Sequence, residues 1–295
     1  MSSHRTFCIA TLAVASVLAI AAAQAADSPA PGSEPQSLQK MDPSVPTPLA
    51  AHIVANDHPM GSQIRLHEGN GLPSFSTRDF TAAVGSVAGM DVSGYQGNVD
   101  WSAAHANGAR FAYVKATEGI DYINPYFAQQ YDGSYQAGMI RGAYHFAHPD
   151  STTGTAQAQA QYFFKNGGAW SADGKTLPGA LDLEYDPYGS DACYGLSQAD
   201  MAAWISSFSN KYYELSGRYP VIYASTGWWT QCVGKSGNFS ATSPLWIARD
   251  ASTVGTLPYA WRYYTFWQYA DSGIFPGDQN LFNGAYTQLV AIARG

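Results

Sequence analysis

The chain has 295 residues and a net charge of −7, and this acidic balance argues against a nucleic-acid-binding protein, which would carry a basic patch. Charged residues make up only 13% of the sequence, whereas aromatic residues reach 14%, with 20 tyrosines and 8 tryptophans. This composition suits a protein that stacks its rings against an uncharged, hydroxyl-rich ligand such as a sugar, and it equally suits a large tyrosine-rich core.

The first 25 residues have the pattern of a cleavable secretory signal. Arg5 is the only residue among them with a formal charge at pH 7, an apolar stretch over residues 9–23 follows, and the small-residue sequence Ala23-Gln24-Ala25 comes next. The apolar stretch is too short and too rich in alanine to remain as a membrane anchor. We therefore expect residues 1–25 to be a signal peptide and the protein to be secreted.

Two segments separate this signal from the main part of the chain. Residues 26–48 are rich in proline and serine and are predicted to be a disordered linker. Residues 49–87 form an N-terminal extension whose role the sequence leaves open, either a pro-region or a strap packed on the following domain. The extension contains His52, His58 and His67, but they lack the spacing of metal ligands, so no metal site is expected there.

From residue 88 to residue 295 the sequence alternates short apolar runs with stretches of helical character, which is typical of β/α units. The predicted strands are 88–93, 110–117, 140–147, 179–185, 219–225, 244–249 and 264–270. The predicted helices are 99–108, 124–138, 153–168, 196–217 and 285–295. The helix at 196–217 has the clearest signals, with Ser197 as its N-cap and one apolar stripe.

Seven or eight mostly parallel strands in about 205 residues predict an α/β fold, an irregular TIM-like β/α barrel of small size. After the fifth strand the intervals shorten, so the last strands are expected to lack full helices. A doubly wound open sheet is the alternative, but no glycine-rich phosphate motif follows the first strand.

Two cysteines remain once Cys8 has left with the signal. Cys193 and Cys232 are an even pair in an oxidising compartment, where a disulfide is favoured over two free buried thiols. Such a bridge would close a loop of roughly 40 residues and stabilise the fold by about 4 kcal/mol.

Distinctive side chains gather where the predicted strands end. In a β/α barrel the active site is built at the C-terminal ends of the strands. The side chains there are Asp91, Tyr95, Gln96, Lys115, Glu118, Tyr144, His145, Phe146, Asp182, Glu184, Tyr223, Trp246, Arg249, Trp267 and Gln268. One acid at a strand end is commonplace, but polar groups at the same end of six or seven strands indicate a cleft.

The segment GALDLEYD at 179–186 carries the most informative acids. Side chains alternate along a strand, so Asp182 and Glu184 share a face, with their Cα atoms about 6.6 Å apart. Two carboxylates this close cannot both ionise easily, and the pKa of one should rise. A protonated acid beside a charged one is what glycosidic bond cleavage requires. The alternative is a pair of acids at a strand end held by a cation or by water.

Several segments occur in the order and at the spacing of a known family: GMDVSGYQGNVDW, FAYVKATEG, RGAYHFAHP, LPGALDLEYD and FWQYADSG. Together they resemble the secreted muramidases of glycoside hydrolase family 25, the Chalaropsis-type lysozymes. The resemblance covers residues 88–295 and not residues 26–87. It implies an irregular β/α barrel, no cofactor, and retaining hydrolysis of the β-1,4 bond between N-acetylmuramic acid and N-acetylglucosamine in peptidoglycan, including O-acetylated walls.

The resemblance also implies roles for the acids. Glu184 would be the general acid/base, and Asp182 would be the nucleophile or would orient a substrate acetamide that acts as nucleophile. Asp91 would line the floor of the cleft, and Asp278 falls where many members carry a further cleft acid. The residues expected to bind substrate are Tyr95, Gln96, Lys115, Glu118, Tyr144, Phe146, Tyr223, Trp246, Trp267 and Gln268.

The sequence also bears on metal binding and on two alternative functions. His145 and His148 could suggest a metal, but with no third ligand in view they are interpreted as hydrogen-bonding or packing residues. The partner is expected to be cell-wall peptidoglycan, with no nucleic acid, no membrane and a monomeric protein. A peptidoglycan-binding barrel without activity would not need paired acids. A chitinase would need a D-x-x-D-x-D-x-E series, which residues 178–180 interrupt.

Overall fold

The computed structural model describes residues 57–69, 85–150 and 154–295. The predicted signal at 1–25 and the predicted linker at 26–48 lie outside these residues. No helix within the described ranges is long and apolar enough to cross a membrane.

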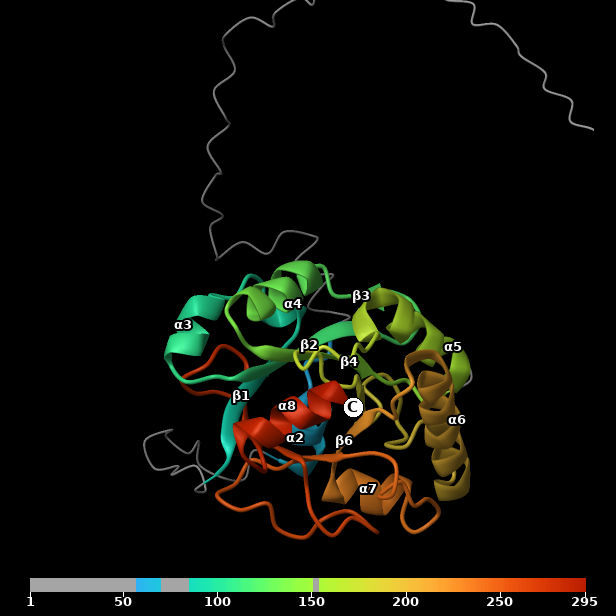
Figure 1. Ribbon diagram of the computed structural model, residues 1–295. Helices are drawn as coiled ribbons and strands as arrows, with labels where there is room; N and C mark the ends of the chain where they lie inside the picture. Colours follow the sequence, from blue (N-terminus) through green and yellow to red (C-terminus); the bar gives the residue numbers. More distant parts are fainter. Residues whose placement is uncertain (1–56, 70–84, 151–153) are drawn as a thin grey trace, which may run out of the picture. The chain divides into compact units, whose positions relative to one another are not determined.

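The strands close into a barrel, as predicted (Figure 1). Parallel strands run from β1 through β2, β4, β5, β6 and β7 to β8, and β9 is antiparallel to both β8 and β1. The bounds are β1 (Val87–Val92), β2 (Phe111–Glu118), β3 (Tyr122–Ile123, antiparallel on β2), β4 (Ile140–Phe146), β5 (Ala180–Asp182), β6 (Val221–Ser225), β7 (Leu245–Ala248), β8 (Phe266–Ala270) and β9 (Asp278–Phe282). All seven predicted strands form, within a few residues of their expected bounds.

Strand β9 is the barrel strand that the sequence pattern did not predict. Its sequence DQNLF begins with residues that are depleted in strands, and its first inward side chains are polar instead of apolar. It pairs in register with β1, so that Asp278 lies opposite Asp91, and with β8 on its other side. The barrel therefore closes through an antiparallel strand, and this closure brings Asp278 to the site.

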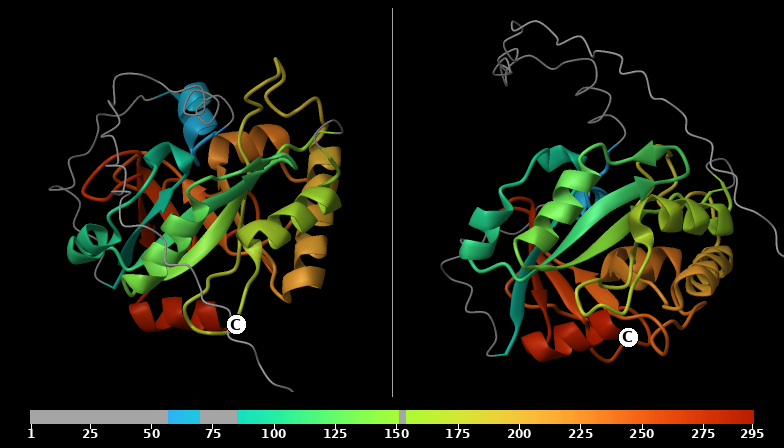
Figure 2. Two further views of the ribbon diagram at one scale, coloured as in Figure 1. Left: turned by 90° about the horizontal axis from the view of Figure 1, so that it is seen from above. Right: turned by 45° about the horizontal axis from the view of Figure 1, so that its top comes forward.

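Helices cover the outside of the first half of the barrel (Figures 1 and 2). They are α3 (Trp101–Ala106), α4 (Phe127–Gln136), α5 (Ala156–Phe163) with the π-helical turn η2 (Phe164–Gly168), and α6 (Gln198–Ser216). The short α7 (Thr226–Cys232) follows β6, and α8 (Tyr286–Arg294) follows β9. Ser197 caps α6 by accepting from the backbone N–H of Asp200, as predicted, and Gly217 ends it with φ 75°. The described chain between β7, β8 and β9 has no helix, which confirms the expected irregularity.

Aromatic side chains fill the barrel interior. The rings of Tyr113 and Trp246 lie 4.7 Å apart between centroids, and Phe266 packs against both. Gly142 in β4 gives Tyr113 its space, because a Cβ there would overlap the Tyr113 ring. The filled interior leaves the C-terminal ends of the strands as the place for a site.

Helices α2 (Ser62–Glu68) and α8 lie at opposite ends of the barrel, as the left view of Figure 2 shows. Tyr286 of α8 lines a cavity with Ser86, Val87 and Ala88, where β1 begins. The segment that contains α2 therefore lies at the C-terminal ends of the strands.

The disulfide predicted from cysteine usage is present. Cys193 and Cys232 are bonded, with Cα atoms 5.3 Å apart, and the bridge ties the loop after β5 to α7. Replacing both cysteines by serine should lower the free energy of unfolding by about 4 kcal/mol, because the unfolded chain regains the freedom of a loop of roughly 40 residues. Urea denaturation of the two proteins measures this, and equal midpoints would contradict it.

Candidate active site

The paired acids lie at the end of β5. Asp182 is the last residue of the strand, and Glu184 follows two residues later. The strand ends earlier than predicted, yet the backbone N–H of Leu183 still donates to the carbonyl of Tyr223 on β6 at 3.0 Å. The side chains therefore keep alternating, and Asp182 and Glu184, which are 0% and 1% exposed, influence each other's ionisation.

Burial sets the protonation of this pair. It raises the pKa of Asp182 well above the usual range, and repulsion from Glu184 raises it further. Apart from Glu184, no described residue shares a hydrogen bond with the Asp182 carboxyl group. Burial also raises the pKa of Glu184, although backbone N–H groups of Gly61, Gln63 and Ile64 favour its ionised form. The pair can hold a proton at a pH where ordinary carboxyl groups are ionised.

A second pair of acids lies beside the first. Gln268 on β8 donates through Nε2 to Asp91 at 3.0 Å and to Asp278 at 2.9 Å. Asn280 Nδ2 donates to Asp91 at 2.6 Å. Burial raises the pKa of Asp91 to about 6 against these hydrogen bonds, and burial with repulsion from Asp91 raises the pKa of Asp278 well above its usual range. Arg65 opposes the shift at Asp278, to which it donates at 3.1 Å.

The raised pKa of Asp91 predicts a pH-dependent stability. Because the folded protein holds this proton up to about pH 6 and the unfolded chain only to 3.8, the stabilisation is complete below pH 3.8 and is lost as the pH rises through 6. The loss is on the order of 1–3 kcal/mol. Asp91→Asn removes the titration, so urea denaturation between pH 4 and 7 should show a smaller decline than in the wild type. Parallel pH profiles would contradict this.

Several residues expected to bind substrate lie around the four acids. Tyr223 donates to Gln268 Oε1 at 2.7 Å, and the Tyr144 hydroxyl accepts from the backbone N–H of Met60 at 3.3 Å. Trp246 is fully buried and donates to Asn280 Oδ1 at 2.9 Å, so it supports the floor of the site from below.

Three others lie elsewhere. Tyr95 is 66% exposed, and Gln96 holds the turn η1 (Gly94–Gln96) by accepting from the backbone N–H of Ser93 at 2.8 Å. Trp267 points to the face opposite Gln268 and donates to the carbonyl of Arg249 at 2.9 Å. The structure does not bring these three side chains into hydrogen-bonding contact with the acids.

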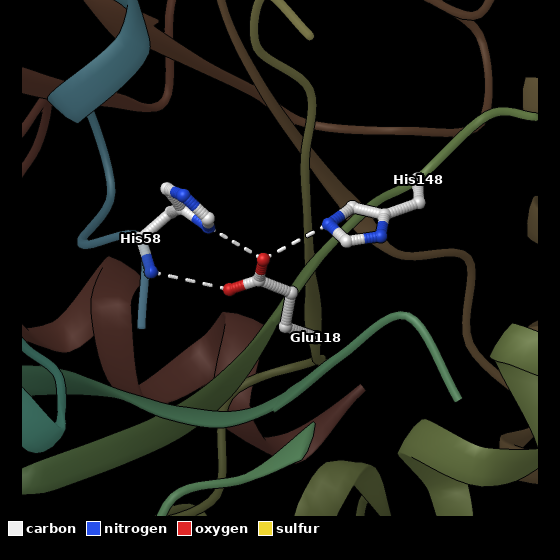
Figure 3. Close-up of side chains that lie close together, drawn as sticks. All are labelled: His58, Glu118 and His148. Atoms are coloured by element: carbon white, nitrogen blue, oxygen red, sulfur yellow. Dashed lines mark hydrogen bonds and ion pairs between the residues drawn. The ribbon is translucent and has the colours of Figure 1, made fainter. Parts of the chain in front are cut away.

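Lys115, Glu118 and Phe146 lie at the side of the site near β2 and β4. The Lys115 ammonium bonds Glu118 at 2.6 Å and lies 5.2 Å from the centre of the Phe146 ring. His148 and His58 also bond Glu118, at 2.9 and 2.6 Å (Figure 3). His58, Glu118 and His148 together offer three atoms that could bind a metal ion, all within 4.8 Å of one another. The sequence alone did not place a third such residue near His148. Because the ammonium already neutralises this carboxylate, we interpret the group as a hydrogen-bonded cluster.

His145 packs inside the fold, away from this cluster. It bonds Thr117 Oγ1 at 2.8 Å and Gln159 Oε1 at 3.0 Å, and burial lowers its pKa to about 3. Asp186, which stands two residues beyond Glu184, accepts from the backbone N–H of Tyr188 at 2.8 Å and so shapes the loop.

The structure adds site residues that the sequence did not suggest. Asn280 could have been found, because it follows Asp278 at the same i, i+2 spacing that pairs Asp182 with Glu184. Arg65 lies in a segment with no motif, and only the fold brings it to Asp278.

A β/α barrel with close, buried carboxyl groups at the end of a strand is the arrangement of a glycoside hydrolase. The model of Glycosyl hydrolases family 25 matches residues 90–278. An N,O-diacetylmuramidase of Arthroderma benhamiae is 52% identical over 211 residues, which are 72% of this chain and 88% of that protein. A solved structure of a muramidase from Acremonium alcalophilum is 54% identical, with a TM-score of 0.69, and covers 71% of this chain and 99% of that one.

Lysozyme M1 of Streptomyces globisporus is 42% identical over 239 residues, which are 79% of this chain and 80% of that protein. Residues 85–295 are 211 of the 295 residues, or 72%, so this match extends into the residues before 85. These matches show that the chain belongs to glycosyl hydrolase family 25 and is a muramidase, as its motifs suggested.

Proposed function

We propose that the protein is a secreted, retaining N-acetylmuramidase that cleaves the β-1,4 bond between N-acetylmuramic acid and N-acetylglucosamine in peptidoglycan. The observation that carries the proposal is the buried pair Asp182 and Glu184, whose raised pKa values permit one protonated and one charged carboxyl group. The signal pattern at residues 1–25 supports secretion, and we propose a monomer that acts on the wall without nucleic acid or membrane.

Glu184 donates its proton to the glycosidic oxygen while the bond from that oxygen to C1 breaks. Asp182 attacks C1, or it holds the acetamide so that the acetamide oxygen attacks C1 from the same side. Glu184 then takes a proton from water, and the water oxygen attacks C1 as the bond from C1 to the Asp182 or acetamide oxygen breaks. Two inversions give net retention. Asp91, Asp278 and Gln268 form the polar floor below the sugar.

The remaining predicted residues would act around this centre. Tyr144 and Tyr223 would bind the sugar next to the acids, and Lys115, Glu118 and Phe146 would bind the neighbouring sugar or its substituents. Tyr95, Gln96, Trp246 and Trp267 would contribute at the margin of the cleft or through the residues they support.

The test uses residues 85–295, because the match to the solved Acremonium muramidase covers 99% of that chain and 71% of this one, about the share that residues 85–295 make up. Peptidoglycan and chitin are incubated with it, and new reducing ends are measured. We expect release from peptidoglycan with muramic acid at the new reducing end, and little from chitin. Binding to walls without release would favour the non-catalytic alternative, and faster release from chitin would favour the chitinase alternative.

A further inference from the structure

The acids of the site are covered by the chain itself. Asp182, Glu184, Asp91 and Asp278 are between 0% and 5% exposed, although a polymeric glycan has to reach them. Residues 57–69, which include α2, make hydrogen bonds or ion pairs with two of these acids, Glu184 and Asp278. This burial is what a substrate-binding cleft shows when a ligand fills it.

The general acid itself is the first anchor. Glu184 accepts from the backbone N–H of Gly61, from that of Gln63 at 2.7 Å and from that of Ile64 at 3.1 Å. These donors occupy both carboxylate oxygens, where a glycosidic oxygen would have to receive the proton. They also favour the ionised form, whereas the first step requires the protonated form.

Gly61 packs tightly against Gln268 of the floor and against Tyr223. Its φ is 84°, and a Cβ on it would lie 2.6 Å from Gln268 Oε1 and 2.9 Å from the Tyr223 hydroxyl. Only glycine suits both the backbone angle and the space. Next to it Met60 is fully buried, with its N–H on the Tyr144 hydroxyl and its carbonyl on Gln268. The segment thus fills the space proposed for the sugar.

Charge matching fixes the segment on both sides of the acids. On the side of β2, Lys115 bonds Asp57 at 2.9 Å and the carbonyl of His58 at 2.7 Å, and His58 bonds Glu118 (Figure 3). On the side of β9, Arg65 bonds Asp278.

The last turn of α2 is held by β6, by α7 and by the loop after β5. Glu68 accepts from the Ser225 hydroxyl, from the Tyr185 hydroxyl at 3.0 Å and from the backbone N–H of Trp228 at 3.2 Å. The His67 ring stacks on Tyr185 with centroids 4.4 Å apart. The contacts therefore run across the cleft from β2 to β6, along the path that a glycan chain would follow.

We propose that residues 57–69 are an intramolecular inhibitor that occupies the glycan-binding cleft, so that the full-length protein is latent and becomes active when the segment leaves. The inference rests on the proposed muramidase function. The partner that it assigns to the cleft is a segment of the same chain. Of the two roles that the sequence left open for residues 49–87, a pro-region or a strap packed on the domain, the proposal favours a pro-region. The match with Lysozyme M1 extends into the residues before 85, so the relative shares at least part of this region.

The test compares release of reducing ends by residues 26–295 and by residues 85–295. With the cleft occupied about 99% of the time, the longer protein should be about 100-fold less active. Equal activity would overturn the proposal. Inactivity of both would instead contradict the muramidase function, and the binding experiment below would still decide whether the segment occupies the cleft.

Two matched variants of residues 26–295 localise the effect. Gly61→Val drives a side chain into Gln268 and Tyr223 and forces an unfavourable φ, so the activity should rise to near that of residues 85–295. Leu66→Ser, at a side chain that is 73% exposed on the same helix, should stay latent. Thermal melting of the barrel confirms that both fold, and a Gly61→Val protein that folds and stays latent would overturn the proposal.

A binding experiment is independent of activity. A synthetic peptide of residues 57–69 is titrated into residues 85–295 by calorimetry, at high concentration because the covalent connection that raises its effective concentration is absent. The wild-type and Leu66→Ser peptides should bind, and the Gly61→Val peptide should bind at least tenfold more weakly. No difference between the three peptides would overturn the proposed mode of occupation.

Discussion

Glu184→Gln in residues 85–295 should lower kcat on peptidoglycan by about 10³-fold while KM changes little. Glutamine keeps the volume and the hydrogen-bonding oxygen of the side chain but carries no transferable proton. The leaving oxygen then departs as an alkoxide, and no base activates the water in the second step. Initial rates of reducing-end release over a range of peptidoglycan concentrations separate kcat from KM.

Asp186→Asn is the matched control for this experiment. Asp186 is also an acid after β5, but its carboxylate accepts from the backbone N–H of Tyr188 and shapes the loop, so its charge is not needed for proton transfer. The control should retain most of the wild-type activity. A Glu184→Gln protein with more than a tenth of the wild-type kcat would remove Glu184 from the role of general acid.

The barrel was predictable from sequence because its parallel strands are apolar runs that alternate with capped helices. Ser197 at the start of α6 and Gly217 at its end are local signals, and the structure follows both. Strand β9 was not predicted because Asp278 and Asn280 point inward to Gln268 and Asp91, so that polar residues occupy positions where a strand pattern expects apolar ones. One of its two pairing partners, β1, is distant in sequence and becomes adjacent only when the barrel closes.

The acids of the site were predictable for a different reason. The alternation of side chains along β5 puts Asp182 and Glu184 on one face, whatever the rest of the fold does. What covers them was not predictable, because the contacts of Gly61 and Arg65 join residues more than 100 positions apart through backbone groups and one ion pair. Neither leaves a periodic signal in the sequence.

Asp182→Asn in residues 85–295 should cost at least 10²-fold in kcat and leave wall binding largely intact. Asp182 is fully buried, and asparagine has nearly the same shape and an amide that can still donate a hydrogen bond to Glu184, so the substitution removes mainly the charge. Without that charge no carboxylate can attack C1 or polarise the acetamide. Pelleting with cell walls measures binding, and reducing-end release measures turnover. Activity within tenfold of the wild type would remove Asp182 from the mechanism.

The same variant carries a second readout that a merely structural role would not move. The carboxylate of Asp182 repels that of Glu184, and a like charge nearby raises a pKa. Removing it should lower the pKa of Glu184, so that the alkaline limb of the residual activity moves to lower pH. An unchanged limb would mean that the two carboxyl groups titrate independently.

Mass spectrometry of acid-quenched wild-type protein distinguishes the two proposed routes, because a glycosyl adduct on Asp182 forms only if Asp182 is the nucleophile.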